Sequence, residues 1–254
     1  MPERERGAFT IAWAGTLAFA VSLLWFVYSY SVRFTDPLAG VASGVPAGEE
    51  ALNGNSTAAP IVVNLLLFTL FAVHHSVLAR PRIKGYVTAV IPPELERSSY
   101  TWVASALFAA VCWWWQPVPG TLYRLDGSLR LIAYLVQAVG LVLTIHASRL
   151  LDVLDLSGVR AVERAAGAQP AQRHVPLKTT GIYALVRHPL YFAWALFVFA
   201  TPDMTATRLT FATVSTLYLM LAIPLEERAL VDTFGPAYDE YRRRVRWRMI
   251  PGLF

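Results

Sequence analysis

The chain has 254 residues, of which 56% are hydrophobic and only 15% are charged. Soluble domains carry closer to about a quarter charged residues, so this composition excludes an ordinary water-soluble fold. The net charge of +5 would suggest a nucleic-acid partner in a soluble protein, but here the basic residues lie between apolar stretches, as they do in the cytoplasmic loops of membrane proteins.

The first apolar stretch, residues 8–30, contains no charged residue and is long enough for a spanning helix, which needs about 20 residues. It is longer than the core of a signal peptide and is followed by no clear cleavage site, so we predict a retained first helix. Residues 31–59 are rich in Gly, Pro, Asn and Ser and have no apolar periodicity. They predict a loop outside the membrane.

Three further apolar stretches follow, at residues 60–79, 99–116 and 129–151. The linker 80–97 between the first two is basic and contains prolines, and the linker 117–128 is rich in Pro and Gly. The single cysteine lies within one of these stretches, so neither an intrachain disulfide nor a cysteine metal site is expected.

The C-terminal part begins with the polar segment 152–187, followed by a short apolar segment, 189–201, and a longer one, 205–225. We predict a tight turn at 202–204 and an amphipathic tail at 226–254. A helix of about 13 residues is below spanning length. Because a short membrane helix is tolerated only where protein or a cavity covers its backbone, a pocket is expected here.

These patterns predict an all-α integral membrane protein with about six transmembrane helices, including a short C-terminal helical hairpin. Residues 1–254 form a single membrane domain in this interpretation. The Lys and Arg content of the loops alternates, which places both termini in the cytoplasm.

Charged groups near membrane depth are costly and are therefore candidates for function. The first candidate cluster contains Arg187 and His188, directly before Pro189. Proline favours the first turn of a helix, and a helix start is a suitable place for an anionic group. The alternative is an interfacial pair whose side chains reach the lipid headgroups.

The second cluster is the acidic pair Glu226 and Glu227, which could bind hydroxyls or an ammonium group; the alternative is that the pair caps a following helix. The third contains Tyr238, Tyr241 and Arg242, after a break at Gly235–Pro236. Their spacing places them on one helical face. The alternative is an amphipathic helix attracted to anionic lipid.

The motif G-x-Y-x-x-x-R-H-P-x-Y, a hairpin, and then E-E-x-x-L-x-x-x-F-G-x-x-Y-x-x-Y follow one another in the segment 178–245. This order resembles the isoprenylcysteine carboxyl methyltransferase superfamily. The resemblance implies that 178–245 is a methyltransferase core with a cytoplasmic pocket for S-adenosylmethionine. The residues that it implies for the cofactor site are Gly181, Tyr183, Arg187, His188, Tyr191, Glu226 and Glu227, with Tyr238, Tyr241 and Arg242 closing it.

Upstream segments resemble the bacterial branch of this superfamily, which includes methanethiol S-methyltransferases and a denitrification-associated group. They are His74–Pro81, Ile91–Tyr100 and Trp113–Pro117. Residues 155–160 also resemble the D-L-F-G-L-R-Q stretch of the thiol branch, but Ser157 replaces Phe and Ala161 replaces Gln. The resemblance implies methylation of a small thiol, in a bacterial inner membrane, without a metal and without nucleic acid.

The residue that activates the acceptor is not fixed by the sequence; His74, His75 and Arg187 are the candidates. The histidines could orient or deprotonate a thiol, or they could hydrogen-bond inside the bundle. Three other functions stay open. They are methylation of a lipid-like acceptor such as a prenylcysteine carboxylate or a lipid amine, an NADPH-dependent membrane reductase, and a non-enzymatic accessory protein. A wide portal to the lipid would favour a lipid-like acceptor, and a small closed cavity would favour methanethiol.

Overall fold

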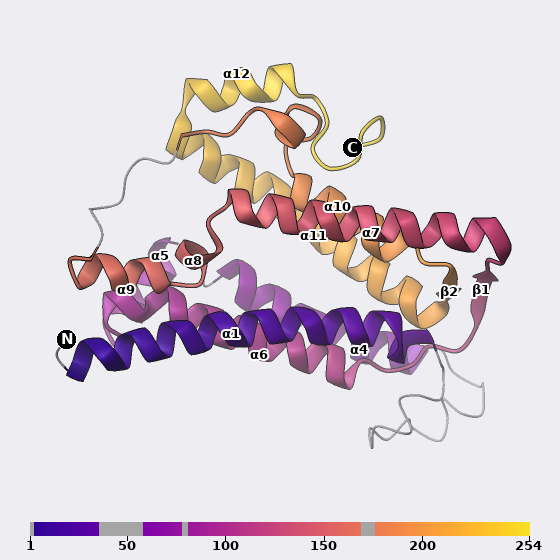
Figure 1. Cartoon of the computed structure of the whole chain (residues 1–254), viewed down its shortest axis with the longest axis horizontal. Coiled ribbons are helices and arrows are strands. Elements are labelled where there is room, and N and C mark those ends of the chain that lie inside the picture. Colours follow the sequence, from indigo (N-terminus) through magenta and orange to yellow (C-terminus); the bar gives the residue numbers. More distant parts are fainter. Residues whose placement is uncertain (1–2, 36–57, 78–80, 169–175) are drawn as a thin grey trace. The chain divides into compact units, whose positions relative to one another are not determined.

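The computed structural model describes residues 3–35, 58–77, 81–168 and 176–254, and they are mainly helical (Figure 1). They form two compact units. The first unit contains the described residues up to 120 together with 151–168, and the second contains 121–150 and 176–254. Most of the predicted loop 31–59 and the end of the predicted span 60–79 lie outside the described residues.

The first unit is built on three long helices, α1 (Glu3–Ser31), α4 (Ala58–Val77) and α6 (Glu96–Trp114). Shorter elements complete it, and these are η1 (Arg33–Thr35), α5 (Pro81–Thr88), η2 (Pro93–Leu95), α8 (Val153–Leu156) and α9 (Val159–Ala165). The basic linker 80–97 thus contains a helix of about two turns, α5.

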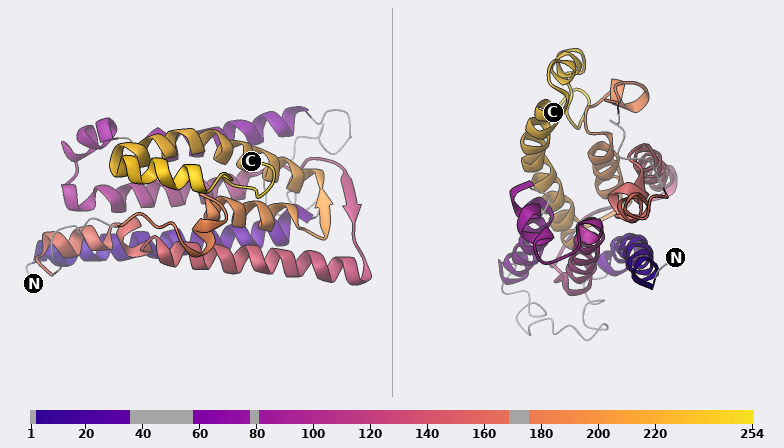
Figure 2. Two further views of the ribbon diagram at one scale, coloured as in Figure 1. Left: turned by 90° about the horizontal axis from the view of Figure 1, so that it is seen from above. Right: turned by 90° about the vertical axis from the view of Figure 1, so that its left-hand side faces the viewer.

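Helices α1 and α6 pack side by side (Figure 2). The contact is close at Gly15, where an added Cβ would lie 3.1 Å from the ring of Trp102. Small residues allow membrane helices to approach each other in this way. Farther toward the N-terminus, Ala12 packs against Val159 and Val162 of α9. The N-terminal half of α1 therefore contributes to the core of the first unit.

Asp155 holds the end of α8 to its neighbours. Its carboxylate accepts hydrogen bonds from Arg97 and Arg164, the latter at 2.8 Å. Burial opposes the charge on Asp155, but the two arginines outweigh burial and lower its pKa. Gly158 has a φ of +93° and follows directly, and an added Cβ would lie 2.4 Å from Oγ of Ser98. Both the backbone angle and the close approach require glycine here.

The second unit consists of α7 (Gly127–Leu150), η3 (Gly181–Ala184), α10 (Pro189–Phe199), α11 (Ala206–Phe234) and α12 (Pro236–Arg244), with strands β1 (Thr121–Arg124) and β2 (Asp203–Thr205). Helix α7 packs closely along α10. An added Cβ at Gly140 would lie 2.9 Å from the main-chain oxygen of Ala193 and the main-chain nitrogen of Phe197. This contact between backbones fixes α10, whose N-terminus carries the first candidate cluster.

A two-stranded antiparallel ribbon was not foreseen. The segment expected to form a tight turn after α10 is strand β2, and it pairs with β1. Arg208, at the start of α11, is buried and donates to Thr201 Oγ1 at 2.8 Å and to the main-chain oxygen of Asp203 at 2.6 Å. The Asp203 side chain in turn pairs with Arg130 of α7 at 2.8 Å. These contacts tie α7, β2 and α11 together.

Helix α11 continues without interruption past Pro224 to Phe234. Glu226 and Glu227 therefore lie inside α11, and the alternative that they cap a following helix is wrong. Proline lacks an N–H donor, but a single internal proline is tolerated in membrane helices where neighbouring groups satisfy the freed backbone. The predicted break at Gly235–Pro236 is confirmed, because α12 begins at Pro236.

Four helical stretches among the described residues are long and apolar enough to cross a membrane. They are Glu3–Thr35, Ala58–Ser76, Gly127–Leu150 and Ala206–Phe234. Helix α10 is apolar but has only 11 residues, as its short apolar segment predicted. The integral membrane character is thus supported by length and composition, while the total of six spans stays a prediction.

Candidate functional site

The start of α10 is held by the C-terminal segment of the chain. Pro189 occupies the first turn of α10, as predicted. Immediately before it, the Arg187 N–H donates to the main-chain oxygen of Trp247 at 2.9 Å, and the His188 N–H donates to that of Arg248 at 2.7 Å. The position of the first candidate cluster therefore depends on residues some 60 positions further along the chain. Such contacts are non-local in sequence.

Arg187 and Glu227 form a buried ion pair. Nε of Arg187 lies 2.6 Å from Oε1 of Glu227, and the two side chains are only 6% and 9% exposed. Nη1 of Arg187 donates to the main-chain oxygens of Val245 at 2.6 Å and Arg246 at 3.0 Å. Burying charges is favourable only when pairing and further hydrogen bonds compensate for lost hydration, and Arg187 has both. Its guanidinium is thus engaged within the protein.

His188 lies between the two acids. Its Nδ1 is 3.5 Å from Oε2 of Glu226, and its Nε2 is 3.4 Å from Oε1 of Glu227. Burial by itself lowers the pKa of His188, but the two carboxylates outweigh burial and raise the pKa above the ordinary histidine value. The two carboxylates therefore make protonation of this ring easier than in an ordinary histidine.

Glu226 is the accessible acid of this cluster, with a side chain that is 46% exposed. The Tyr191 hydroxyl donates to its Oε1, and the Tyr191 ring stacks on His188 with centroids 5.4 Å apart. Two carboxylates one residue apart thus have different surroundings: Glu227 is enclosed by cations, and Glu226 faces outward. Only Glu226 is well placed to meet a ligand directly.

The tyrosines of the third cluster form a neighbouring apolar core. Tyr238 and Tyr241 of α12 are buried and pack with Tyr183 of η3, and the Tyr241 hydroxyl donates to the main-chain oxygen of Tyr183 at 2.7 Å. Burial, reinforced by the negative charge of Glu227, raises the pKa of Tyr238 to about 12. The phenol therefore stays neutral at physiological pH. Gly181, whose φ is +63°, begins the turn that brings Tyr183 here.

Arg242 differs from the other predicted residues. Its side chain is 49% exposed and pairs with Asp239 on the same helix at 2.8 Å. Only its main-chain oxygen reaches the cluster, as a 3.5 Å acceptor from Arg187. The spacing argument placed Arg242 on the face of the two tyrosines, whereas its guanidinium lies on the surface of α12.

Arg248 belongs to the cluster but was not singled out from the sequence. Its Nε lies 3.7 Å from Oε2 of Glu227. The motif resemblance ends at residue 245, and a basic residue in a basic tail gave no separate signal. The exposed aromatic Trp247 beside it was also passed over.

His74 and His75 lie on α4 in the first unit. Nδ1 of His75 is 2.7 Å from the Tyr100 hydroxyl, and the His74 ring stacks on Tyr100 with centroids 5.4 Å apart. Within the described residues, both ring nitrogens of His74 are buried and make no hydrogen bond. Tyr100 thus contacts both histidines, but their part in a reaction stays a prediction.

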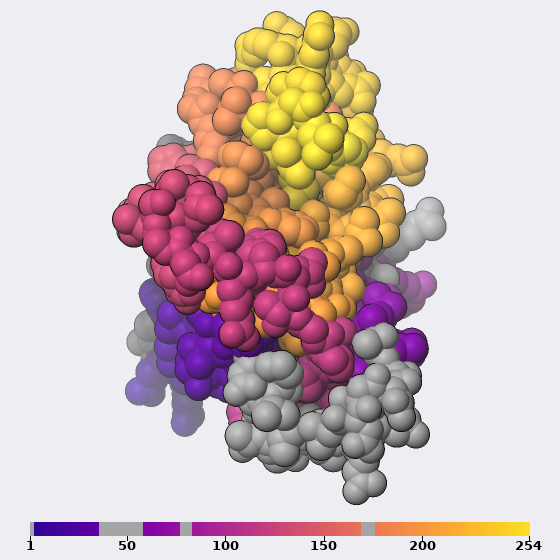
Figure 3. All heavy atoms as spheres, turned by 90° about the vertical axis from the view of Figure 1, so that its right-hand side faces the viewer, coloured from indigo at the N-terminus to yellow at the C-terminus, as the bar shows by residue number. Residues whose placement is uncertain are grey.

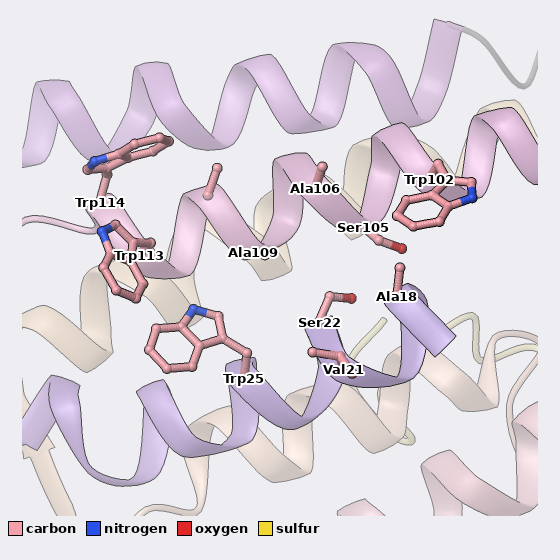
Figure 4. Close-up of a pocket in the computed structure, with 11 residues that line it drawn as sticks. Ala18, Val21, Ser22, Trp25, Trp102, Ser105, Ala106, Ala109, Trp113 and Trp114 are labelled. Atoms are coloured by element: carbon pink, nitrogen blue, oxygen red, sulfur yellow. The ribbon is translucent and has the colours of Figure 1, made fainter. Parts of the chain in front are cut away.

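A separate hollow of about 530 Å³ lies in the first unit between α1 and α6 (Figure 4). Its lining is mainly alanine and tryptophan, with Ser22 and Ser105 as its hydroxyls. None of the candidate site residues lines it. Among the described residues, no group of three or more His, Cys, Asp or Glu side chains could hold a metal ion.

Comparison with known proteins places this chain in a family. Residues 128–245 match a family described as a protein of unknown function, DUF1295. Methanethiol S-methyltransferase 1 of Bradyrhizobium diazoefficiens is 35% identical over 94% of this chain and 80% of its own length. Methanethiol S-methyltransferase of Crocosphaera subtropica is 35% identical over 79% of each chain. The chain belongs to the methanethiol S-methyltransferase family.

The family also has a more distant relative. Nurim of Xenopus laevis is 27% identical to this chain, and the match covers 82% of this chain and 80% of the length of Nurim. No solved structure matches the chain. The matched stretch 128–245 contains the buried pair, the acids and the tyrosines of the second unit, and it ends just before Arg248.

Proposed function

We propose that this protein is a membrane methyltransferase that transfers a methyl group from S-adenosylmethionine to methanethiol, giving dimethyl sulfide. The observation that carries the proposal is the 35% identity to methanethiol S-methyltransferase 1 over 94% of the chain. A likeness over nearly the whole chain includes both units, rather than the C-terminal motifs alone.

The residues of the second unit fit such a donor. S-adenosylmethionine supplies, when bound, a methyl group on a positively charged sulfonium. The exposed carboxylate of Glu226 can accept hydrogen bonds from ribose hydroxyls or an ammonium group, and Tyr191 orients it. Charge-assisted hydrogen bonds of this kind are the stronger ones. Gly181, Tyr183 and Tyr238 line the rest of the cofactor site in this proposal, as the motif resemblance implies.

Arg187 and Glu227 act in this proposal mainly by holding the site together. Their pair is buried and supported by main-chain oxygens, so it fixes the start of α10 against α11. His188 lies between the acids, with its Nδ1 3.5 Å from Oε2 of Glu226. A rigid frame of this kind is what a displacement reaction needs, because rate depends on keeping the reacting atoms aligned and dry.

The acceptor reacts as a thiolate, since the thiolate is the nucleophile. The sulfur of methanethiol forms a bond to the methyl carbon, the sulfonium bond to that carbon breaks with its electron pair staying on the departing sulfur, and the thiol proton passes to a base. His75, hydrogen-bonded to Tyr100, and His74 are the candidates for this base. Arg187 is a weaker candidate because its guanidinium is already engaged.

We further infer from the likeness to the bacterial methanethiol S-methyltransferases that the protein lies in a bacterial inner membrane. Six spans, both termini in the cytoplasm and a cytoplasmic cofactor pocket complete this proposal. The positive-inside rule supports the orientation, because the Lys and Arg content of successive loops alternates along the sequence.

The decisive experiment measures dimethyl sulfide in the headspace above detergent-purified protein supplied with S-adenosylmethionine and methanethiol. Glu226→Gln is compared with Glu240→Gln, which removes an exposed acid on α12. We expect product from the wild type, a loss of roughly tenfold or more for Glu226→Gln, in line with one lost charged hydrogen bond, and no change for Glu240→Gln.

Folded wild-type protein that forms no dimethyl sulfide refutes the proposed acceptor. The same preparation is then supplied with a prenylcysteine and with a lipid amine, and NADPH oxidation is followed separately. Single variants His74→Gln and His75→Gln identify the base, because loss of the base lowers turnover while donor binding is retained.

A further inference from the structure

The segment 245–254, here called the C-terminal latch, runs from the end of α12 back to the start of α10. In the space-filling view its yellow residues lie directly against orange residues of the same unit (Figure 3). It offers the main-chain oxygens of Trp247 and Arg248 to the N–H groups of Arg187 and His188. It also offers the oxygens of Val245 and Arg246 to the Arg187 guanidinium.

The latch is closed on itself by one oxygen. The main-chain oxygen of Phe254 accepts the N–H groups of Arg248, Met249 and Ile250 at 3.0, 2.9 and 3.0 Å. Successive N–H groups that converge in this way form a concavity for a negatively charged or strongly polar oxygen. Gly252, with a φ of +82° and open space around it, makes the reversal that brings Phe254 back.

An apolar residue and a charged one fasten the latch to the helices. Met249 is fully buried and packs with Ala195 of α10 and Ile223 of α11. Arg248 lies with its Nε 3.7 Å from Oε2 of Glu227 and its guanidinium carbon 5.4 Å from the ring centre of Phe254. Arg248 therefore connects the closed end of the latch to the acid that pairs with Arg187.

We propose that the C-terminal latch is a positioning element of the donor site, and that Arg248 is its positioning residue. Arg248 and Arg187 approach different oxygens of Glu227, so together they fix the plane of that carboxylate. The main-chain contacts of the latch fix the backbone of Arg187 and His188. The inference rests on the proposed function, and it adds residues beyond the matched family stretch 128–245.

The test compares Arg248→Gln with Arg246→Gln. Both variants remove one positive charge from the same segment, but the Arg246 side chain is exposed and only its main-chain oxygen contributes. We expect Arg248→Gln to raise KM for S-adenosylmethionine about fivefold with a smaller change in kcat, because its side chain is 40% exposed and such a pair contributes at most about 1 kcal/mol. Arg246→Gln should stay within twofold of the wild type. Arg248→Lys should recover part of the loss.

Hydrogen–deuterium exchange tests the latch without an activity assay, because it reports how well the N–H groups before α10 are protected. Peptides covering residues 186–190 should exchange faster in Phe254→Ala and Gly252→Ala than in the wild type, and Leu253→Ala, at an exposed position, should not alter them. Equal exchange in all these proteins, or equal KM for the two arginine variants, overturns the latch proposal. Failure of the folded wild type to bind S-adenosylmethionine by calorimetry instead overturns the proposed function, while the exchange result still decides the latch.

Discussion

Glu227→Gln removes the negative charge that Arg187, His188 and Arg248 surround, and it keeps the shape of the side chain. Breaking one side of a buried ion pair costs about 3–5 kcal/mol, because the other charge stays buried without compensation. Arg187 and Glu227 are 6% and 9% exposed, so the buried case applies. In the variant, Arg187 keeps its hydrogen bonds to the main-chain oxygens of Val245 and Arg246. We therefore expect a loss of stability at the lower end of this range, about 3 kcal/mol.

The assay is thermal unfolding in detergent, followed together with donor binding. For a chain of this size, about 3 kcal/mol corresponds to a fall in Tm of roughly 6–12 °C. The double variant Arg187→Met/Glu227→Gln should recover part of this loss, because both charges are then absent from the interior. A single variant with unchanged Tm, or a double variant whose loss equals the sum of both singles, refutes the argument that the two residues form a compensated buried pair.

Three further predictions concern charge and packing. The pKa of His188 is raised in the folded protein. The stability that protonated His188 adds to the fold is therefore complete below its unfolded pKa of about 6.5 and is lost as pH rises through the folded pKa. Tm measured from pH 6 upward should fall in the wild type and fall less in His188→Gln. Gly140→Leu should cost about 1–3 kcal/mol by overpacking the α7–α10 contact, whereas Gly7→Leu, with open space around it, should leave Tm nearly unchanged. The pKa of Asp155 is lowered in the folded protein. The stability that ionised Asp155 adds to the fold is therefore present above its unfolded pKa of about 3.9 and is lost as pH falls through the folded pKa. Asp155→Asn should lower the free energy of unfolding by about 1 kcal/mol at neutral pH, and by less in high salt, because the Asp155–Arg164 pair is partly exposed.

Local sequence rules located the helices well where a residue acts within its own segment. Pro189 marked the start of α10, and Gly235–Pro236 marked the break before α12, because both residues restrict their own backbone. Pro224, by contrast, does not interrupt α11. A helix whose two ends are held by packing tolerates one proline, which lacks a backbone N–H donor. No local sequence pattern shows that the helix is held in this way.

Arg187, His188, Glu226 and Glu227 were singled out from the sequence, but the different surroundings of the two acids were not predicted. Arg187 and Glu227 are 40 positions apart, and spacing does not tell which of two adjacent acids will be buried. The structure makes Glu227 the enclosed partner and Glu226 the exposed one. Arg248 was missed because the basic tail contains several arginines that are equivalent in sequence. Arg248 is distinguished by its contacts with Phe254, which appear only in the structure.

The unbroken course of α11 has a mechanical consequence. Its 29 residues make a rod of about 44 Å at 1.5 Å per residue, whereas the hydrocarbon core of a bilayer is about 30 Å thick. Where α11 crosses the bilayer, roughly the last third of the rod stands clear of the lipid tails and carries Glu226 and Glu227 with it. The helix continues through Pro224 without a break between its apolar part and these acids, so bilayer thickness and helix tilt together set the height at which they stand above the tails. Lipid composition is thereby coupled to the depth of the site through a single stiff element.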